Sequence, residues 1–158
     1  MLFLTPADLR GLDARAVEEL LGRSGLVIAL GAGEVRGLAA AALLFADYAV
    51  LDRDASLIVD EPEAWAAVAW RLGRRAIAWS VRGAVAAEVV DEITELDAES
   101  WRERWMRGRS ALALDSAAEL IRRRGGDALE RAEFARLFAI SEPQRGLRAF
   151  LAKQKPPF

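Results

Sequence analysis

The side chains that could do acid–base chemistry in this protein are carboxylates, Lys and Arg cations, and one tyrosine. The chain of 158 residues contains no histidine and no cysteine. Ser-His-Asp and Cys-His catalysis are therefore excluded, as are zinc sites built from histidine or cysteine ligands. Proton transfer would fall to one of the 24 Asp and Glu residues, one of the 22 Lys and Arg residues, or Tyr48. We expect no metal site and no disulfide.

The composition is typical of a single globular domain. Apolar residues make up 53 % of the chain, charged residues 29 %, and the net charge is -2. This charge argues against nucleic acid as a partner, because nucleic-acid binding normally requires a basic face. The longest apolar stretch, Gly37 to Ala46, is about half as long as a membrane-spanning helix needs to be. The N-terminus also lacks a basic leader and a cleavage site, so we expect a cytoplasmic protein without a membrane partner.

The hydrophobic pattern predicts strands early in the chain and helices late. Short apolar runs between turn residues predict strands over 26–30 and 47–51, with a further candidate over 56–59. Helices are predicted where apolar residues recur at helical spacing between stop signals, over 6–21, 38–45, 62–73, 74–81, 99–107, 111–124, 127–140 and 143–152. No repeat or linker indicates a second domain. We therefore predict one domain over 1–158, with a core over about 1–93 and a helical oligomerisation region over about 97–158.

One segment, which follows the first predicted strand and includes the second and third, resembles a family signature. Residues 33–61 read GEVRGLAAAALLFADYAVLDRDASLIVDE. This is similar to the crotonase (enoyl-CoA hydratase/isomerase) pattern G-x-a-x-G-G-G-x-E-L-x-x-x-x-D, with a second acid fourteen residues later. Gly33, Gly37 and Asp47 fall on the glycines and the aspartate without a gap, and Glu61 falls on the second acid.

The C-terminal segment carries a second resemblance to the same family. Residues 146–158 read GLRAFLAKQKPPF, similar to the family's terminal pattern E-G-x-x-A-F-x-E-K-R-K-P-x-F. Only about 30 residues precede Gly33, where the family has a long spiral of strands and helices. The resemblance implies an α/β protein: a truncated crotonase-like (ClpP/crotonase-type) ββα core with a helical C-terminal half.

The resemblance implies a site for an acyl-CoA thioester. Glu61 would move a proton at the carbon next to the thioester carbonyl, and the backbone N–H of Leu38, beside Gly37, would form part of an oxyanion hole. Ala41 falls on the family's first catalytic glutamate and cannot transfer a proton. A single acid at the position of Glu61 is closer to the family's isomerases than to its hydratases. Lys153 and Lys155 would contact CoA phosphates.

Each of these residues also has a plainer interpretation. Glu61 could be a first-turn acid before Pro62 that the helix dipole stabilises. Gly37 could serve only a tight turn before a close-packed helix. Lys153 and Lys155 could be solvated charges of the tail. The sequence leaves these alternatives open.

Two functions follow from the resemblance. The first is an enzyme with enoyl-CoA isomerase or hydratase chemistry and enolate stabilisation, of the kind used in fatty acid metabolism, with CoA as part of the substrate and no separate cofactor. The second is a non-catalytic relative that serves as a structural or regulatory subunit. The family's assembly through C-terminal helices implies a homo-oligomer, trimer or hexamer, or a hetero-oligomer with a full-length paralogue.

Overall fold

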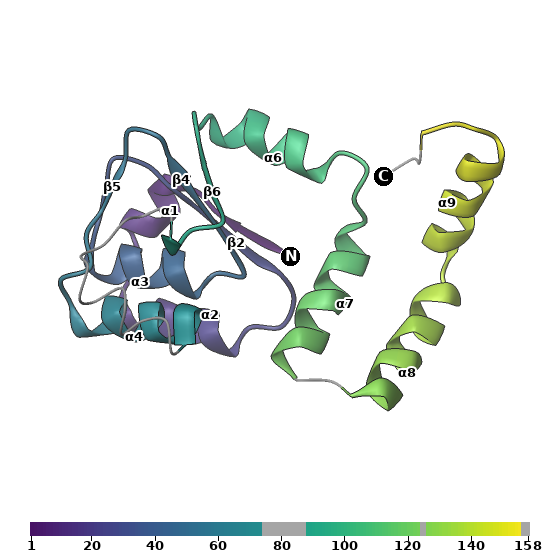
Figure 1. Ribbon diagram of the computed structural model, residues 1–158, viewed down its shortest axis with the longest axis horizontal. Coiled ribbons are helices and arrows are strands. Elements are labelled where there is room, and N and C mark those ends of the chain that lie inside the picture. Colours follow the sequence, from purple (N-terminus) through teal and green to yellow (C-terminus); the bar gives the residue numbers. More distant parts are fainter. Residues whose placement is uncertain (74–87, 124–125, 156–158) are drawn as a thin grey trace. The chain divides into compact units, whose positions relative to one another are not determined.

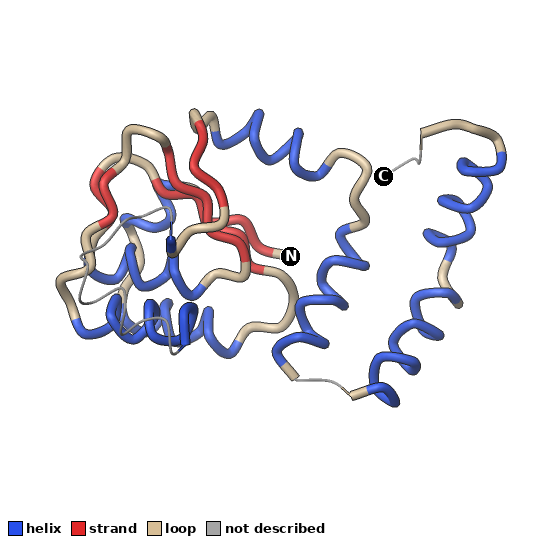
Figure 2. The backbone as a smooth tube through the Cα atoms, in the orientation of Figure 1, coloured by secondary structure: helices blue, strands red, loops and turns tan. Residues whose placement is uncertain are grey.

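Parallel strands joined by helices form the first part of the protein (Figures 1 and 2). The computed structural model describes residues 1–73, 88–123 and 126–155. One sheet has four parallel strands, in the order β1 (Leu2–Leu4), β2 (Val27–Gly31), β4 (Tyr48–Asp52) and β6 (Glu92–Thr94). A second, two-stranded sheet pairs β3 (Glu34–Val35) with β5 (Ser56–Leu57), also in parallel. The predicted α/β class is confirmed.

Four helices accompany these strands in the order α1 (Pro6–Arg10), α2 (Ala14–Gly22), α3 (Gly37–Phe45) and α4 (Pro62–Leu72). Figure 1 shows α2, α3 and α4 together on one side of the four-stranded sheet. Helix α3 is the centre of this layer, because it contacts β2 and β4 as well as α2 and α4. Its interior residues Ala40 to Leu44 are completely buried. Their mostly small side chains let the neighbouring elements approach closely from several directions.

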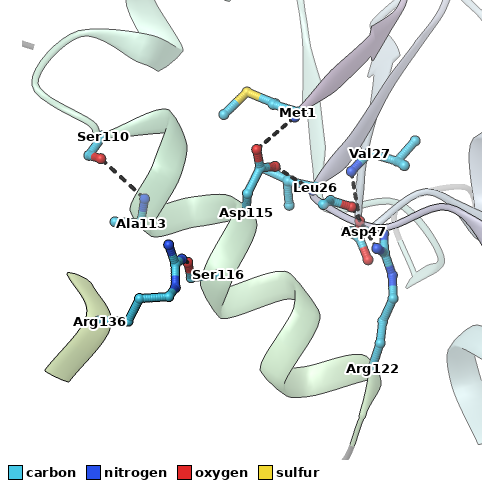
Figure 3. Close-up of polar contacts among 11 residues, drawn as sticks. Met1, Leu26, Val27, Asp47, Ser110, Ala113, Asp115, Ser116, Arg122 and Arg136 are labelled. Carbon is cyan, nitrogen blue, oxygen red and sulfur yellow. Dashed lines mark hydrogen bonds and ion pairs between the residues drawn. The ribbon is translucent and has the colours of Figure 1, made fainter. Parts of the chain in front are cut away.

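Two aspartates fix how neighbouring strands align. The N–H of Asp47 donates to the carbonyl of Val27 at 2.9 Å, and the Asp47 carboxylate accepts the N–H of Val27 at 2.7 Å (Figure 3). Asp91 makes the same reciprocal pair with Ala49, at 2.9 and 2.7 Å. Each aspartate directly precedes a strand, β4 or β6. Each pair therefore sets the register one residue before the regular parallel ladder begins.

Arg71 links the ends of three elements. Its guanidinium donates to the carbonyls of Leu44 at 3.3 Å and Ala46 at 2.7 Å, at the C-terminal end of α3. It also forms an ion pair with Asp91. The Arg71 side chain is only 13 % exposed. A single cation thus satisfies carbonyls that the helix leaves unbonded and holds α4 against α3 and the start of β6.

The rest of the chain is helical. It contains α6 (Ala98–Met106), α7 (Ala111–Arg122), α8 (Asp127–Phe138) and α9 (Ser141–Leu151). The chain divides into two compact units: a strand-containing unit of 2–23 and 27–98, and a helical unit of 99–158 with Met1 and 24–26. Among the residues that the structure describes, no helix is long and apolar enough to cross a membrane.

Polar contacts organise the helical unit. The Asp115 carboxylate of α7 accepts the N–H of Leu26 and pairs with the Met1 ammonium, both at 2.7 Å (Figure 3). Burial raises the pKa of Asp115, but these hydrogen bonds and the nearby charge of Arg122 outweigh it, so the pKa lies below its ordinary value. Arg136 of α8 donates to the Ser116 hydroxyl of α7 at 3.0 Å. These bonds specify how α7 meets α8 and the 24–26 segment.

Several predicted elements are confirmed, and one was wrong. The strands at 26–30 and 47–51 and the helices at 38–45 and 62–73 match β2, β4, α3 and α4 within about one residue at each end. The predicted helix over 6–21 is two helices, because the Asp13 carboxylate accepts the N–H of Ala16 at 2.8 Å and caps a new helix. Strands β1, β3 and β6 were not predicted. The helix predicted at 74–81 lies outside the described residues.

Replacing Arg71 with Met should lower the free energy of unfolding by about 2–3 kcal/mol, because two carbonyls and a carboxylate lose a largely buried charged partner. Replacing Arg53 with Met is the control. Arg53 pairs with Glu95 at 2.9 Å on the surface, with side chains 64 % and 83 % exposed, and its loss should cost less than about 1 kcal/mol. Urea unfolding measures both. Equal costs would show that Arg71 does not link the three elements.

Candidate functional site

The start of helix α3 offers backbone N–H groups at the edge of the core. Arg36 occupies the N-cap position in an extended conformation, and its side chain makes no capping hydrogen bond. Gly37, the first helical residue, has a φ of +55°, which favours glycine. The N–H groups of the first turn carry the partial positive charge of the helix N-terminus. This helix start can therefore stabilise a negative charge that comes close to it.

The Glu61 carboxylate lies against this helix start. Glu61 is itself the N-cap residue of α4, followed by Pro62, yet its side chain makes no capping hydrogen bond to α4. A Cβ atom added to Gly37 would lie 3.0 Å from both Oε1 and Oε2 of Glu61. The structure thus brings together Gly37 and Glu61, two of the residues singled out in the sequence. The Glu61 side chain is not engaged as a cap of its own helix.

The small β3–β5 sheet explains why the two helix starts meet. Its register pairs Glu34 with Ser56 and Val35 with Leu57. The N–H of Ile58 continues the pairing with a 2.9 Å bond to the carbonyl of Val35. Helix α3 begins two residues after β3, and α4 begins shortly after β5. Parallel pairing therefore places both helix N-termini at the same edge, as in other α/β sites.

An ion pair stands beside these two residues. Arg36, directly before Gly37, pairs with Asp60, directly before Glu61, and also lies 3.5 Å from Glu34. The hydrogen bond and charge of Asp60, with a smaller contribution from Glu34, raise the pKa of Arg36. Sequence analysis gave Asp60 no role. The signal that could have found it is the alternation of side chains along two extended segments, which turns Asp60 away from Glu61 and toward Arg36.

Leu38 and Ala41 occupy the other two positions of interest on α3. The Leu38 side chain is partly buried against the core. Its backbone N–H lies in the first turn of α3. Ala41 is completely buried within the core. Ala41 is therefore a packing position, and its side chain carries no group that could transfer a proton.

The two lysines belong to a different part of the chain. Lys153 and Lys155 are exposed and follow the end of α9, in the helical unit, whereas Gly37 and Glu61 belong to the strand-containing unit. Lys153 has a φ of +53°, a conformation common at helix ends. Their contact with CoA stays a prediction. Within the described residues, no group of three or more carboxylates could hold a metal ion.

Comparison with known proteins identifies the fold. The structure is similar to that of DspI from Pseudomonas aeruginosa, with a TM-score of 0.65 and 23 % identity over 90 % of this chain and 64 % of DspI. An enoyl-CoA hydratase/isomerase from Marinobacter aquaeolei gives a TM-score of 0.68 and 20 % identity, over 96 % of this chain and 73 % of that one. One from Cupriavidus metallidurans CH34 gives 0.65 and 25 %, over 91 % and 64 %.

These similarities define a class by its fold: the chain has the fold of the enoyl-CoA hydratase/isomerase, or crotonase, structures. The resemblance found in the sequence is confirmed at this level. The chain spans about two thirds of the length of these structures. No family model and no curated protein matches it.

Replacing Gly37 with Ala should lower the free energy of unfolding by about 2–3 kcal/mol. Part of this is the strain of a side chain at positive φ, about 1–2 kcal/mol, and part is displacement of the Glu61 carboxylate. Gly33 is the matched control, because its φ is +69° but no atom lies within 4 Å of the added Cβ. Gly33→Ala should therefore cost only the strain. Equal costs in urea unfolding would place Glu61 away from Gly37.

Proposed function

We propose that this protein binds an acyl-CoA thioester and moves a proton at the carbon next to the thioester carbonyl. The observation that carries this proposal is the Glu61 carboxylate lying against the N-terminus of α3 at Gly37. A base and an oxyanion-stabilising helix start side by side are what enolate chemistry needs. The shared fold with enoyl-CoA hydratase/isomerase structures adds support.

In the proposed mechanism, the thioester oxygen faces the N–H of Leu38 at the start of α3. Glu61 removes a proton from the α-carbon of a 3-enoyl thioester, and the negative charge moves to the thioester oxygen. The helix start stabilises this enolate more strongly than the neutral thioester, which lowers the barrier. Glu61 then returns the proton to the γ-carbon, and the double bond moves from C3–C4 to C2–C3. Gly37 lets the carboxylate approach, because a Cβ at this position would contact it.

In the described part of the chain, we place one acid, Glu61, at the start of α3, and this favours double-bond isomerisation over hydration. Water addition needs a group that activates water and a group that delivers a proton to carbon. Ala41, which the sequence resemblance aligns with a second acid, is completely buried and cannot ionise. A single carboxylate that takes up and returns one proton satisfies the isomerase reaction. Lys153 and Lys155 are proposed to pair with phosphates of the CoA moiety.

Replacing Glu61 with Gln should abolish isomerisation of 3-hexenoyl-CoA, with turnover lowered at least about 100-fold, because the amide cannot accept the proton. Binding of acetyl-CoA and crotonyl-CoA, measured by calorimetric titration, should change less than about threefold. Glu63→Gln is the control, since Glu63 is an exposed acid in the first turn of the same helix. Unchanged turnover in Glu61→Gln would refute the mechanism. Absence of CoA thioester binding in the unmodified protein would refute the proposed substrate.

A second candidate function is that of a non-catalytic subunit. It is favoured by Ala41 and by the apolar surface of the helical unit. Large apolar side chains exposed on α8 and α9 are Leu129, Phe134, Phe138, Leu147, Phe150 and Leu151. Some of them border an open apolar groove of about 380 Å³, lined by residues of α7, α8 and α9 and the turns beside them. Apolar surface of this extent usually belongs to an interface. Co-purification of a longer, paralogous chain would favour this function.

Both functions lead to the same prediction about assembly. Sedimentation at micromolar concentration should give a trimer or hexamer. Replacing Phe150, which is 77 % exposed on α9, with Glu should shift the equilibrium toward monomer by placing a charge in an apolar interface. Glu103→Arg, at an exposed charged position on α6, should leave the assembly unchanged. A monomer for the unmodified protein would contradict the proposed oligomer.

A further inference from the structure

Two consecutive residue pairs meet across the start of α3 and the start of α4. Arg36 and Gly37 are consecutive, as are Asp60 and Glu61. Arg36 and Glu61 are both extended, with φ and ψ of -140° and 170° and of -111° and 152°. Neighbouring side chains on extended backbone point to opposite sides. Arg36 therefore meets Asp60 on one side, while Glu61 meets Gly37 on the other.

The backbone contacts between these two segments end before Glu61. In the described chain, the bond from the Ile58 N–H to the Val35 carbonyl is the last backbone hydrogen bond that joins them. Two residues, Val59 and Asp60, separate Ile58 from Glu61. Beyond Ile58, the Arg36–Asp60 ion pair joins the two segments. A change at either side chain would let the residue before Glu61 move relative to Gly37.

We propose that Arg36 and Asp60 act as positioning residues, whose ion pair holds the Glu61 carboxylate against the start of α3. This inference rests on the proposed function. Arg36 does not reach the reacting atoms as a base or acid in this scheme, and it acts through Asp60 on the placement of Glu61. Glu34 lies 3.5 Å from the same guanidinium, but this longer contact joins two side chains that are each more than half exposed.

The expected effect on turnover is larger than the effect on stability. The Arg36 and Asp60 side chains are 55 % and 35 % exposed, and ion pairs at such positions add little to the stability of a fold. Displacement of a reacting group by about 1 Å, however, can lower turnover by about 100-fold. The Arg36 side chain makes no capping bond to α3, so its replacement should not loosen the helix start. The pair should therefore matter for kcat rather than for folding.

The test compares Arg36→Met, Asp60→Asn, the double variant and Arg36→Lys, with Glu61→Gln as reference. Arg36→Met should lower kcat for 3-hexenoyl-CoA about tenfold or more, with KM changed less than about threefold and little change in Tm. Arg36→Lys should retain most of the activity, since an ammonium can still pair with Asp60. The double variant should lose no more than the worse single variant. Glu34→Gln, which removes the other carboxylate near Arg36, should stay within about twofold of the unmodified protein.

A second readout does not depend on activity. The backbone amide NMR signals of Gly37 and Leu38 report whether a carboxylate lies at the start of α3. They should move in Arg36→Met in the same direction as in Glu61→Gln. The proposal is overturned if Arg36→Met leaves both kcat and the two amide signals unchanged while Glu61→Gln loses turnover. That result would leave the proposed function intact. If the experiments on the unmodified protein or on Glu61→Gln refute the proposed function, the amide signals alone test the positioning. Shifts of the Gly37 and Leu38 signals that Arg36→Met shares with Glu61→Gln would support it, and unmoved signals in Arg36→Met would overturn it.

Discussion

Helix α3 is enclosed by strands β2 and β4 and by helices α2 and α4, and this burial determines where the candidate site lies. Residues Ala40 to Leu44 have no exposed surface. A helix packed in this way can neither rotate nor slide without opening cavities or forcing overlaps, both of which cost several kcal/mol in a dense core. Its N-terminal N–H groups are therefore fixed at one edge of the core. Its C-terminal carbonyls need a partner at the other end, and Arg71 provides it.

The remainder of the strand-containing unit depends on charged side chains at strand starts. Asp47 and Asp91 each exchange two hydrogen bonds with a residue of the neighbouring strand. These short parallel strands make few ladder bonds of their own, so a carboxylate before each strand adds a bond where the ladder is weakest. The Asp91 carboxylate also forms an ion pair with Arg71 of α4. Strand register and helix packing are thereby coupled through one cation and one carboxylate.

The candidate site places few polar groups on this rigid frame. One carboxylate, Glu61, lies against the start of α3 at Gly37, and Ala41 of the same helix is buried in the core. This is the arrangement on which the proposed reaction depends, in which a single group removes and returns one proton. The fold is that of enoyl-CoA hydratase/isomerase structures, of which this chain spans about two thirds. In the proposed mechanism, Leu38 can serve at the oxyanion position, because the donor is the backbone N–H and not the side chain.

The sequence alone determined the elements whose signals are local. The apolar runs at 26–30 and 47–51, the small-residue helix at 38–45 and the Pro62 helix start were predicted, since each pattern lies within its own element. The crotonase resemblance was also available from residue types and spacing. Strands β1 and β6, three residues each, were not predictable, because their hydrogen bonds go to residues distant in the sequence.

Only the tertiary structure decided how the site residues face one another. The crotonase resemblance indicated Glu61 and Gly37, but their contact depends on the β3–β5 pairing, which is non-local. The partnership of Arg36 with Asp60 follows from the same pairing. Local sequence sets the conformation of each segment, whereas the meeting of two segments depends on the packing of the whole core around α3.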